Sequence, residues 1–173
     1  MNLKVNLLFS DGASAALFIP ENMRNRFKGS LAKVEEILTD FYISDIIRFD
    51  NNRFFLDNQV KEQVPKLVSN SVIKPILAKQ DLSLSDIKEW SIHQGGSHIL
   101  KRFSDDSVLG LTSEQLSRSQ EMFEKYGNFS APSCFFVLDR FMREDSNGKA
   151  GIKGMMVGFG AGLYQAALLY QWV

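Results

Sequence analysis

The sequence predicts a mixed α/β fold, in which a sheet carries helices on its faces. Short runs rich in β-branched and aromatic residues alternate along the chain with segments whose apolar residues recur at helical spacing, and this alternation is typical of α/β proteins. The 173 residues are 45% hydrophobic and 23% charged, a balance that can bury a sizeable core. The chain shows no internal repeat, low-complexity tract or linker, so we expect one domain or one half of a larger one.

Charge and residue usage exclude several classes of function. Twenty Lys and Arg residues offset twenty Asp and Glu residues, whereas nucleic-acid binding usually shows as a clustered positive excess. Apolar runs such as 134–138 are far shorter than a membrane span, and no signal-peptide pattern follows Met1. The single cysteine, Cys134, excludes an internal disulfide and a cysteine-based zinc site. We therefore expect a cytoplasmic protein without nucleic-acid partner, membrane partner or metal.

A hairpin is predicted at the start of the chain. Asp11-Gly12 separates the apolar runs 4–9 and 13–19, and an Asp-Gly pair in this position predicts two antiparallel strands. The small residues of the second run indicate close packing against another backbone. Because the chain begins almost inside the first strand, with nothing before it to pack on, we expect that an upstream element is missing.

The next stretch of the chain predicts an ambiguous segment and a helix. The apolar spacing of 31–41 fits a helix, whereas the β-branched and aromatic content of 41–49 favours a strand. Residues 60–80 place apolar side chains near one face and predict a helix. Pro65 suits its first turn if the helix proper begins there, and Pro75 should kink or shorten it.

A short strand and a well-delimited helix follow. Residues 90–92 predict a buried strand that ends at His93. Thr112 and Gln115 form a capping box that opens a helix to Lys125, and Gly127 is well placed to end it.

The C-terminal third predicts one more apolar helix-like stretch and two strands. Ser130 is a candidate cap for residues 131–141. Residues 154–159 and 163–172 predict strands joined by a glycine-rich turn.

Four short motifs are candidates for chemistry, and each also has a plain structural explanation. His93 ends a strand before two glycines that let a helix start against a close neighbour, yet a core histidine fits the same junction. Asn128 follows a glycine at a helix end, which is ordinary turn chemistry. The alternating glycines of 158–162 can present N–H groups to a negative centre or form a tight hairpin. The fourth motif, residues 8–15, is weak alone.

Together and in this order, the motifs resemble the C-terminal half of thiolase-fold condensing enzymes. They read Leu-Phe-x-Asp-Gly-Ala-x-Ala, Trp-x-Ile-His-x-Gly-Gly-x-x-Ile-Leu, Tyr-Gly-Asn-x-Ser and Gly-Phe-Gly-x-Gly-Leu. The His-x-Gly-Gly and Gly-Phe-Gly-x-Gly-Leu motifs are similar to type III polyketide synthases of the chalcone synthase kind, and residues 54–60 are more similar to ketoacyl-ACP synthase III. The resemblance implies a thiolase-like C-terminal half over 26–173, preceded by residues 1–25 as a hairpin left from the N-terminal half.

The resemblance also implies a catalytic pocket. In these families a cysteine nucleophile, a histidine and an asparagine share one site, and the latter two correspond here to His93 and Asn128. Decarboxylation of a malonyl thioester leaves an enolate, to which a neutral imidazole and a carboxamide each supply one N–H donor without a buried charge. The resemblance further implies a loop that forms an oxyanion hole or borders the pocket, and two residues that line the pocket. The loop residues are Gly158, Phe159, Gly160, Ala161 and Gly162, and the lining residues are Phe54 and Phe55.

The nucleophile itself is missing from this chain. In these families it lies upstream of the Asp-Gly-Ala hairpin, and only ten residues precede Asp11. Cys134 lies in an apolar run, where we expect a buried structural thiol. The chain is then a truncated product of a longer enzyme, one subunit of a split pair, or a diverged stand-alone relative. A lone C-terminal half would expose the apolar face meant for its twin.

Three functions compete. The favoured one is the C-terminal part of an acyltransferase for decarboxylative Claisen condensation of malonyl thioesters with an acyl starter, as in fatty acid or polyketide synthesis, inactive without an N-terminal half. The alternative is a non-catalytic partner subunit that stabilises or regulates a complete condensing enzyme, although such a subunit has no chemical reason to keep His93 and Asn128. An unrelated α/β binding domain would need four motif coincidences. The expected partners are acyl-CoA or acyl carrier protein thioesters, the N-terminal half and a second copy in a dimer, with no cofactor.

Overall fold

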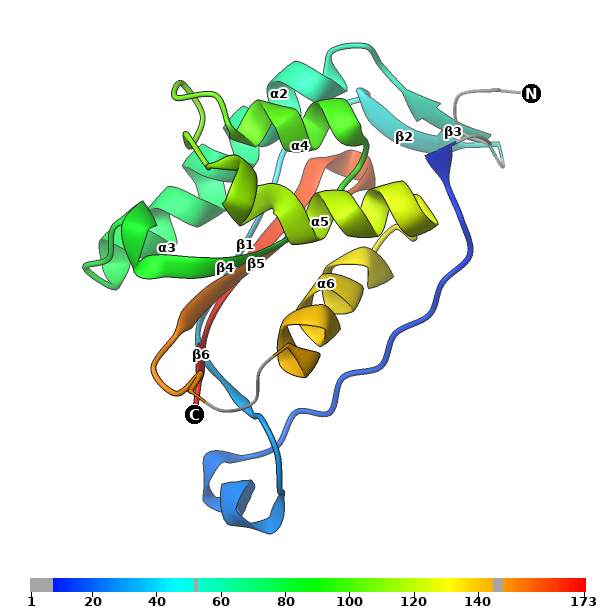
Figure 1. Ribbon diagram of the computed structural model, residues 1–173. Helices are drawn as coiled ribbons and strands as arrows, with labels where there is room; N and C mark the ends of the chain where they lie inside the picture. The colour runs from blue at the N-terminus through cyan, green and yellow to red at the C-terminus, as the bar shows by residue number, and fades with distance from the viewer. Residues whose placement is uncertain (1–7, 52, 145–147) are drawn as a thin grey trace.

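The computed structural model describes residues 8–51, 53–144 and 148–173. Its centre is a four-stranded mixed sheet in the order β1-β6-β5-β4 (Figure 1), with a separate two-stranded sheet of β2 and β3. β4 and β5 run parallel, and the other neighbours are antiparallel. The strands are β1 Ala32–Phe41, β2 Ile47–Asp50, β3 Arg53–Leu56, β4 Ile87–Ile92, β5 Lys153–Phe159 and β6 Tyr164–Trp172.

Helices cover the sheet unequally. The α-helices are α2 Val60–Val68, α3 Lys74–Lys79, α4 Ser97–Phe103, α5 Ser113–Tyr126 and α6 Pro132–Arg143, the π-helical turn is η2 Ser69–Ile73, and the 3₁₀ turns are η1 Glu21–Arg26, η3 Leu84–Asp86 and η4 Ala161–Leu163. Residues of α2, η2, α3 and α4 form the main core with Trp90, Ile92, Val157 and Leu169 of the sheet. α5 protects the β4 edge, because the Ser119 hydroxyl accepts the N–H of Ile92 at 3.1 Å.

The opposite side of the sheet is only partly covered, and we call it the open face. It carries Ile37, Leu168 and Met156 in register across β1, β6 and β5, and α6 reaches it where the Ser91 hydroxyl donates to the Cys134 carbonyl at 2.5 Å. Toward β1 no helix of the described residues covers it: Ile37 is 53% exposed, and Phe41 and Tyr164, stacked 5.4 Å apart, are 56% and 63% exposed.

The predicted hairpin at the N-terminus is not formed. The run 4–9 falls mostly on residues outside the described range, and residues 10–20 contain no strand, so the prediction of a strand over 13–19 is wrong. These residues form a long extended trace that leaves the region of β3 and runs to η1 at the opposite end of the molecule (Figure 1). A strand requires a neighbouring strand for its backbone hydrogen bonds, and the described part of the chain offers none there.

The structure resolves the ambiguous segment 31–49 and confirms the helix predicted after it. The ambiguous segment 31–49 forms strands β1 and β2. The helix over 60–80 is confirmed, but it begins at Val60 instead of near Pro65 and is divided by the π-helical turn immediately before Pro75, as expected for a proline that cannot donate to the preceding turn.

The caps of the later helices are confirmed at α5 and wrong at α6. Thr112 and Gln115 form the capping box, and Gly127, at φ +77°, ends α5. Ser130 does not cap α6 with its side chain, because Ala131 is the N-cap and makes no side-chain hydrogen bond. Ser130 has φ +61°, and its backbone carbonyl accepts the N–H of Ser133.

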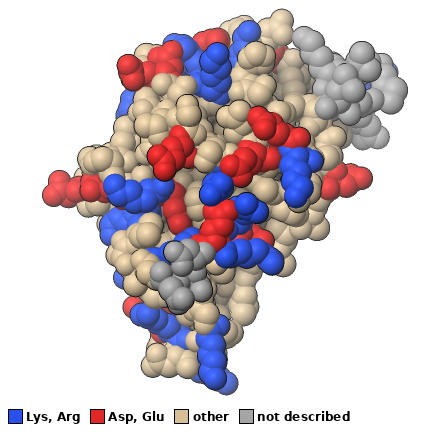
Figure 2. Space-filling view, viewed as in Figure 1, with Lys and Arg blue, Asp and Glu red and all other residues tan. Residues whose placement is uncertain are grey.

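Acidic and basic side chains are interspersed over the face seen in Figure 2. Several of them join α5 to the end of α6, because Arg118 lies 2.9 Å from both Glu121 and Glu144. None of the helices in the described ranges combines the length and hydrophobicity required to cross a bilayer.

Candidate active site

His93 lies just beyond the carboxyl end of β4. Its N–H donates to the Val157 carbonyl at 2.8 Å, which extends the pairing of β4 with β5. Its ring lies 4.8 Å from the Phe159 ring, between centroids, and the residue is 7% exposed. Burial lowers the pKa of His93 to about 4, because the charged imidazolium loses its hydration. The imidazole is therefore neutral near pH 7.

Two glycines hold the turn between His93 and α4. Gly95 and Gly96 have φ of +58° and +150°, which side chains with a Cβ rarely adopt. A Cβ on Gly95 would lie 2.8 Å from Ile99 and 2.9 Å from the Phe159 ring. The Gly-Gly pair thus lets α4 begin directly against the residues that surround His93.

Asn128 is fixed by its backbone and by one end of its side chain. It is 1% exposed and follows Gly127, whose positive φ ends α5. Its N–H donates to the Leu8 carbonyl at 3.1 Å, and its carbonyl accepts the Ser10 N–H at 3.0 Å. The Oδ1 atom accepts the Ser130 N–H at 2.7 Å, so the amide NH₂ group is the end of the side chain directed away from that backbone.

Residues 8–10 bring the separate motifs together. Leu8, which bonds to Asn128, also lies 3.7 Å from the position of a Cβ on Gly96. The Phe9 ring meets the Phe54 ring edge-on at 5.3 Å. The turn after His93, the loop of Asn128 and the β2–β3 hairpin therefore all border one short segment.

The two phenylalanines proposed as pocket lining face different ways. Phe54 contacts Phe9 beside the Asn128 loop. Phe55 lies under the Arg48 guanidinium, which is 4.7 Å above its ring, and successive residues of a strand point to opposite faces. Phe54 therefore lies beside the Asn128 loop, whereas Phe55 points to the other face of the β2–β3 hairpin, and a pocket-lining role stays a prediction for both.

The glycine loop 158–162 is a hairpin turn between β5 and β6. The N–H of Gly160 donates to the Tyr164 carbonyl at 2.9 Å, so this N–H is not available to an oxyanion. A Cβ on Gly158 would lie 3.9 Å from the Cys134 sulfur, whereas a Cβ on Gly160 would meet no atom of the described residues within 4 Å. The loop was predicted either to donate N–H groups to an oxyanion or to border the pocket. The second role, in which a substrate closely approaches Gly160, stays a prediction.

Cys134 is buried, as expected. Its Sγ donates to the Val157 carbonyl at 3.0 Å, the same carbonyl that accepts the His93 N–H. Burial raises the pKa of the Cys134 thiol to about 12, because a thiolate is poorly solvated there. A thiol that stays protonated is a poor nucleophile, and the hydrogen bond of Cys134 joins α6 to the end of β5 beside His93.

Two buried glutamines at this end of the sheet are not among the residues predicted from the sequence. Gln94 is 1% exposed and Gln165 is 4% exposed. A polar residue directly after His93, and a glutamine in an otherwise apolar strand, are the signals that could have found them.

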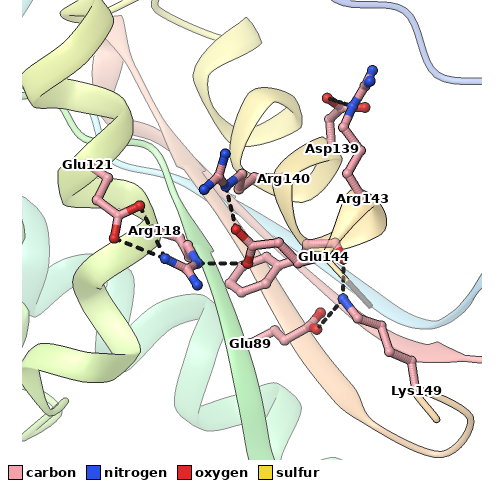
Figure 3. A network of polar contacts seen from close by, with 9 residues as sticks. Glu89, Arg118, Glu121, Asp139, Arg140, Arg143, Glu144 and Lys149 are labelled. Atoms are coloured by element: carbon pink, nitrogen blue, oxygen red, sulfur yellow. Dashed lines mark hydrogen bonds and ion pairs between the residues drawn. The ribbon is translucent and has the colours of Figure 1, made fainter. Parts of the chain in front are cut away.

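A second polar cluster, the Glu89 cluster, lies toward the start of β4, and Figure 3 shows two of its members, Glu89 and Lys149. We define it as Glu89, Lys149, Tyr170 and Trp172. Glu89 accepts hydrogen bonds from the Tyr170 hydroxyl at 2.9 Å and the Trp172 indole at 2.6 Å, and lies 3.2 Å from the Lys149 ammonium. Lys149 also donates to the Phe141 carbonyl at the end of α6. The cluster therefore links α6 to two strands, β4 and β6.

Comparisons with known proteins give a consistent result. Residues 42–173 match the family described as chalcone and stilbene synthases, C-terminal domain. The 3,5-dihydroxyphenylacetyl-CoA synthase of Amycolatopsis orientalis is 31% identical over 180 residues, which cover 97% of this chain and 45% of that protein. A putative chalcone synthase of Bacillus subtilis is 27% identical, over 99% of this chain and 48% of its own length. This chain thus spans about half the length of these curated relatives.

Solved structures show the same fold. The 1,3,6,8-tetrahydroxynaphthalene synthase of Streptomyces coelicolor, a bacterial type III polyketide synthase, superposes with a TM-score of 0.74 at 23% identity, over 84% of this chain and 42% of its own. The polyketide synthase PKS-I of Ectocarpus siliculosus gives a TM-score of 0.68 at 23% identity, over 82% and 40%. The predicted fold, the C-terminal half of a thiolase-like architecture, is confirmed.

Proposed function

This chain belongs to the chalcone and stilbene synthase family, whose C-terminal domain it matches, and on that premise we propose that it is the C-terminal part of an acyltransferase. The reaction is the decarboxylative Claisen condensation of a malonyl thioester with an acyl starter. The observation that carries the proposal is that His93 and Asn128 are both buried hydrogen-bonding groups, and that the segment 8–10 bonds to Asn128 and approaches the turn after His93.

The chemistry requires donors that carry no charge. When the malonyl group loses CO₂, the electron pair of the broken C–C bond passes into an enolate, and its negative charge gathers on the thioester oxygen. The enolate carbon then attacks the acyl carbonyl and expels the thiolate of the nucleophile. His93, neutral because burial lowers its pKa to about 4, and the NH₂ group of Asn128 are suited to donate to that oxygen.

The nucleophile has to come from another segment. Cys134 is the chain's one cysteine, and its buried thiol has a pKa raised to about 12. We propose that an N-terminal half, on the same longer chain or on a separate subunit, carries the reactive cysteine. The coverage of about 45% of a curated relative supports this proposal.

The open face supports the same proposal. A hollow of about 830 Å³ lies between residues 13–34 and the outer side of α6, and it is lined by apolar side chains that include Leu17, Phe135, Leu138, Met142, Met156 and Leu168. Apolar side chains grouped at the surface are a feature of interfaces between proteins. We propose that the N-terminal half docks here and that residues 1–25 belong with it, because the extended residues 13–19 need strand partners.

The remaining assignments follow from the family. We propose acyl-CoA or acyl carrier protein thioesters as substrates, a dimer as the assembled form and the cytoplasm as the location. Polyketide formation is favoured over fatty acid synthesis, since the relatives found are polyketide synthases.

The test is decarboxylation of radiolabelled malonyl-CoA by the assembled enzyme. The N-terminal half for this test is to be sought in the reading frame upstream of Met1 and in adjacent genes. We expect release of CO₂ by the assembly, strong loss in His93→Ala and Asn128→Ala, and parental rates in the exposed control His98→Ala. The chain alone should show no covalent acyl adduct by mass spectrometry after incubation with acyl-CoA. Parental rates in both site variants would reject the proposal and favour a non-catalytic partner subunit.

A further inference from the structure

Three buried polar atoms at the His93 end of the sheet have no hydrogen-bond partner among the described residues. They are Nδ1 of His93, Oε1 of Gln94 and Nε2 of Gln165. The only other such atom in these residues, Nε of Arg102, lies 3.0 Å from the Glu62 carboxylate. A buried polar group without a partner is costly, so three of them at one end of the sheet require an explanation.

The three atoms come from the same end of the sheet. His93 and Gln94 follow β4, and Gln165 is paired with Phe159 at the junction of β5 and β6. Phe159 connects the β5–β6 junction to the residues after β4, because its ring contacts the His93 ring and closely approaches Gly95. Gln165 also shares a side of β6 with Ala167 and Leu169, which belong to the main core.

The hydrogen-bonding capacities of these atoms are complementary to one water molecule. The Gln165 Nε2 group can only donate, and the Gln94 Oε1 atom can only accept. A water that accepts from Gln165 has two protons left, one for Gln94 and one for His93 Nδ1. Buried waters typically make about three hydrogen bonds to polar groups that are otherwise unsatisfied.

We propose that Gln94 and Gln165 are positioning residues that hold a buried water against Nδ1 of His93 and thereby keep the ring proton on Nε2. When Nδ1 accepts a hydrogen bond, it cannot carry the proton of a neutral imidazole. Nε2–H is then the donor that His93 presents to a substrate. The catalytic consequence rests on the proposed function, whereas the protonation state does not.

The proton position can be measured on the 173-residue chain itself. The chain has two histidines, so ¹⁵N-histidine labelling gives two ring systems, and exposed His98 serves as an internal reference. We expect the His93 proton on Nε2 and a nuclear Overhauser effect between a long-lived water and the His93 ring. In Gln165→Leu and Gln94→Leu, the Nδ1 resonance should shift downfield, toward that of a nitrogen without a hydrogen bond.

Controls separate this proposal from the proposed function. Gln171→Leu removes a glutamine from the same strand that bonds to the Gly151 carbonyl, and it should leave the His93 resonances unchanged. In the assembled enzyme, Gln165→Leu should lower kcat about tenfold, the effect of one hydrogen bond, with KM unchanged. A His93 proton on Nδ1, no water contact in the parent, or an unmoved Nδ1 resonance in both variants overturns the proposal. An inactive assembly with the expected spectra counts only against the proposed function.

Discussion

The polar groups near the two ends of β4 differ in whether the protein itself supplies their hydrogen-bond partners. Near the start of the strand, Glu89 is paired with Lys149, Tyr170 and Trp172, and the chain supplies every partner. Beyond its end, His93 has a buried ring nitrogen without a partner among the described residues. In a buried cluster that stabilises the fold, the protein supplies a partner for every hydrogen-bonding group. In a cluster that binds another molecule, some hydrogen-bonding groups have no partner within the protein.

The largest effect on stability is expected from the Glu89 cluster. Glu89→Ala leaves the Lys149 ammonium buried without its counter-ion, and removing one partner of such a pair costs about 3–5 kcal/mol. The free energy of unfolding in denaturant measures the loss. Glu121→Ala, which removes an exposed partner of Arg118, is the matched control and should cost less than about 1 kcal/mol. Equal losses of unfolding free energy would mean that the buried Glu89 cluster contributes no more to stability than an exposed ion pair.

The site at the other end should respond in the opposite sense. His93→Ala and Asn128→Ala are expected to lower the decarboxylation rate of the assembled enzyme by about 10²–10³-fold, the typical effect of removing one such donor. The unfolding midpoint of the isolated chain should change far less than in Glu89→Ala. If His93→Ala unfolds as readily as Glu89→Ala, the main role of His93 is to stabilise the core.

Acidity should expose the same difference. Because burial lowers the pKa of His93 to about 4 from its ordinary 6.5, the unfolded chain binds more protons between these values, and stability falls as the pH drops from about 6.5 to about 4. The shift corresponds to up to about 3 kcal/mol. The free energy of unfolding, measured across this pH range, should fall more steeply in the parent than in His93→Gln. Parallel curves would contradict the burial of the ring.

Two glycines of the same hairpin sharpen the contrast. A Cβ on Gly154, beside the Glu89 cluster, would lie 2.1 Å from the Tyr170 ring. Gly154→Ala must therefore displace the tyrosine and should cost about 1–3 kcal/mol. Its melting temperature, compared with that of Gly160→Ala, measures the effect. A variant as stable as the parent would mean that Tyr170 moves without leaving Glu89.

The smallest change in stability is expected at Gly160. Its φ of −165° is extended backbone that any residue adopts, and a Cβ there meets no described atom within 4 Å. Gly160→Val should change stability by less than about 0.5 kcal/mol, yet it should block condensation if the acyl group approaches this glycine. Melting temperature and turnover are measured on one preparation. Normal turnover per folded molecule would remove the loop from the site.

Local chemistry was predicted well from the sequence. The capping box of Thr112 and the terminating Gly127 depend on residues within one turn, and both are confirmed. The order of four motifs indicated the thiolase-like fold and two candidate families of condensing enzymes, because such an order survives changes at most other positions. The division of the helix before Pro75 follows from the missing N–H of proline.

What depends on distant partners was not predicted. The strand over 13–19 fails because the described residues supply no neighbouring strand, a fact that the Asp-Gly turn does not reveal. Ser130 lies where a cap is expected, but its positive φ turns the chain differently. The burial of Gln94 and Gln165 arises from the meeting of β4, β5 and β6, so it became visible only in three dimensions.

The bonds that join residues 8–10 to Asn128 have a consequence for how the protein is made. The Ser10 hydroxyl donates to the Tyr126 carbonyl, 116 residues further along the chain, and closing so long a loop carries a large entropic cost. On the ribosome, the early segment must wait until α5 has been synthesised before it finds its place. The loop of Asn128 is therefore expected to order late in folding, after the helices around it, and chaperones would encounter the apolar run of residues 13–19 in the interval.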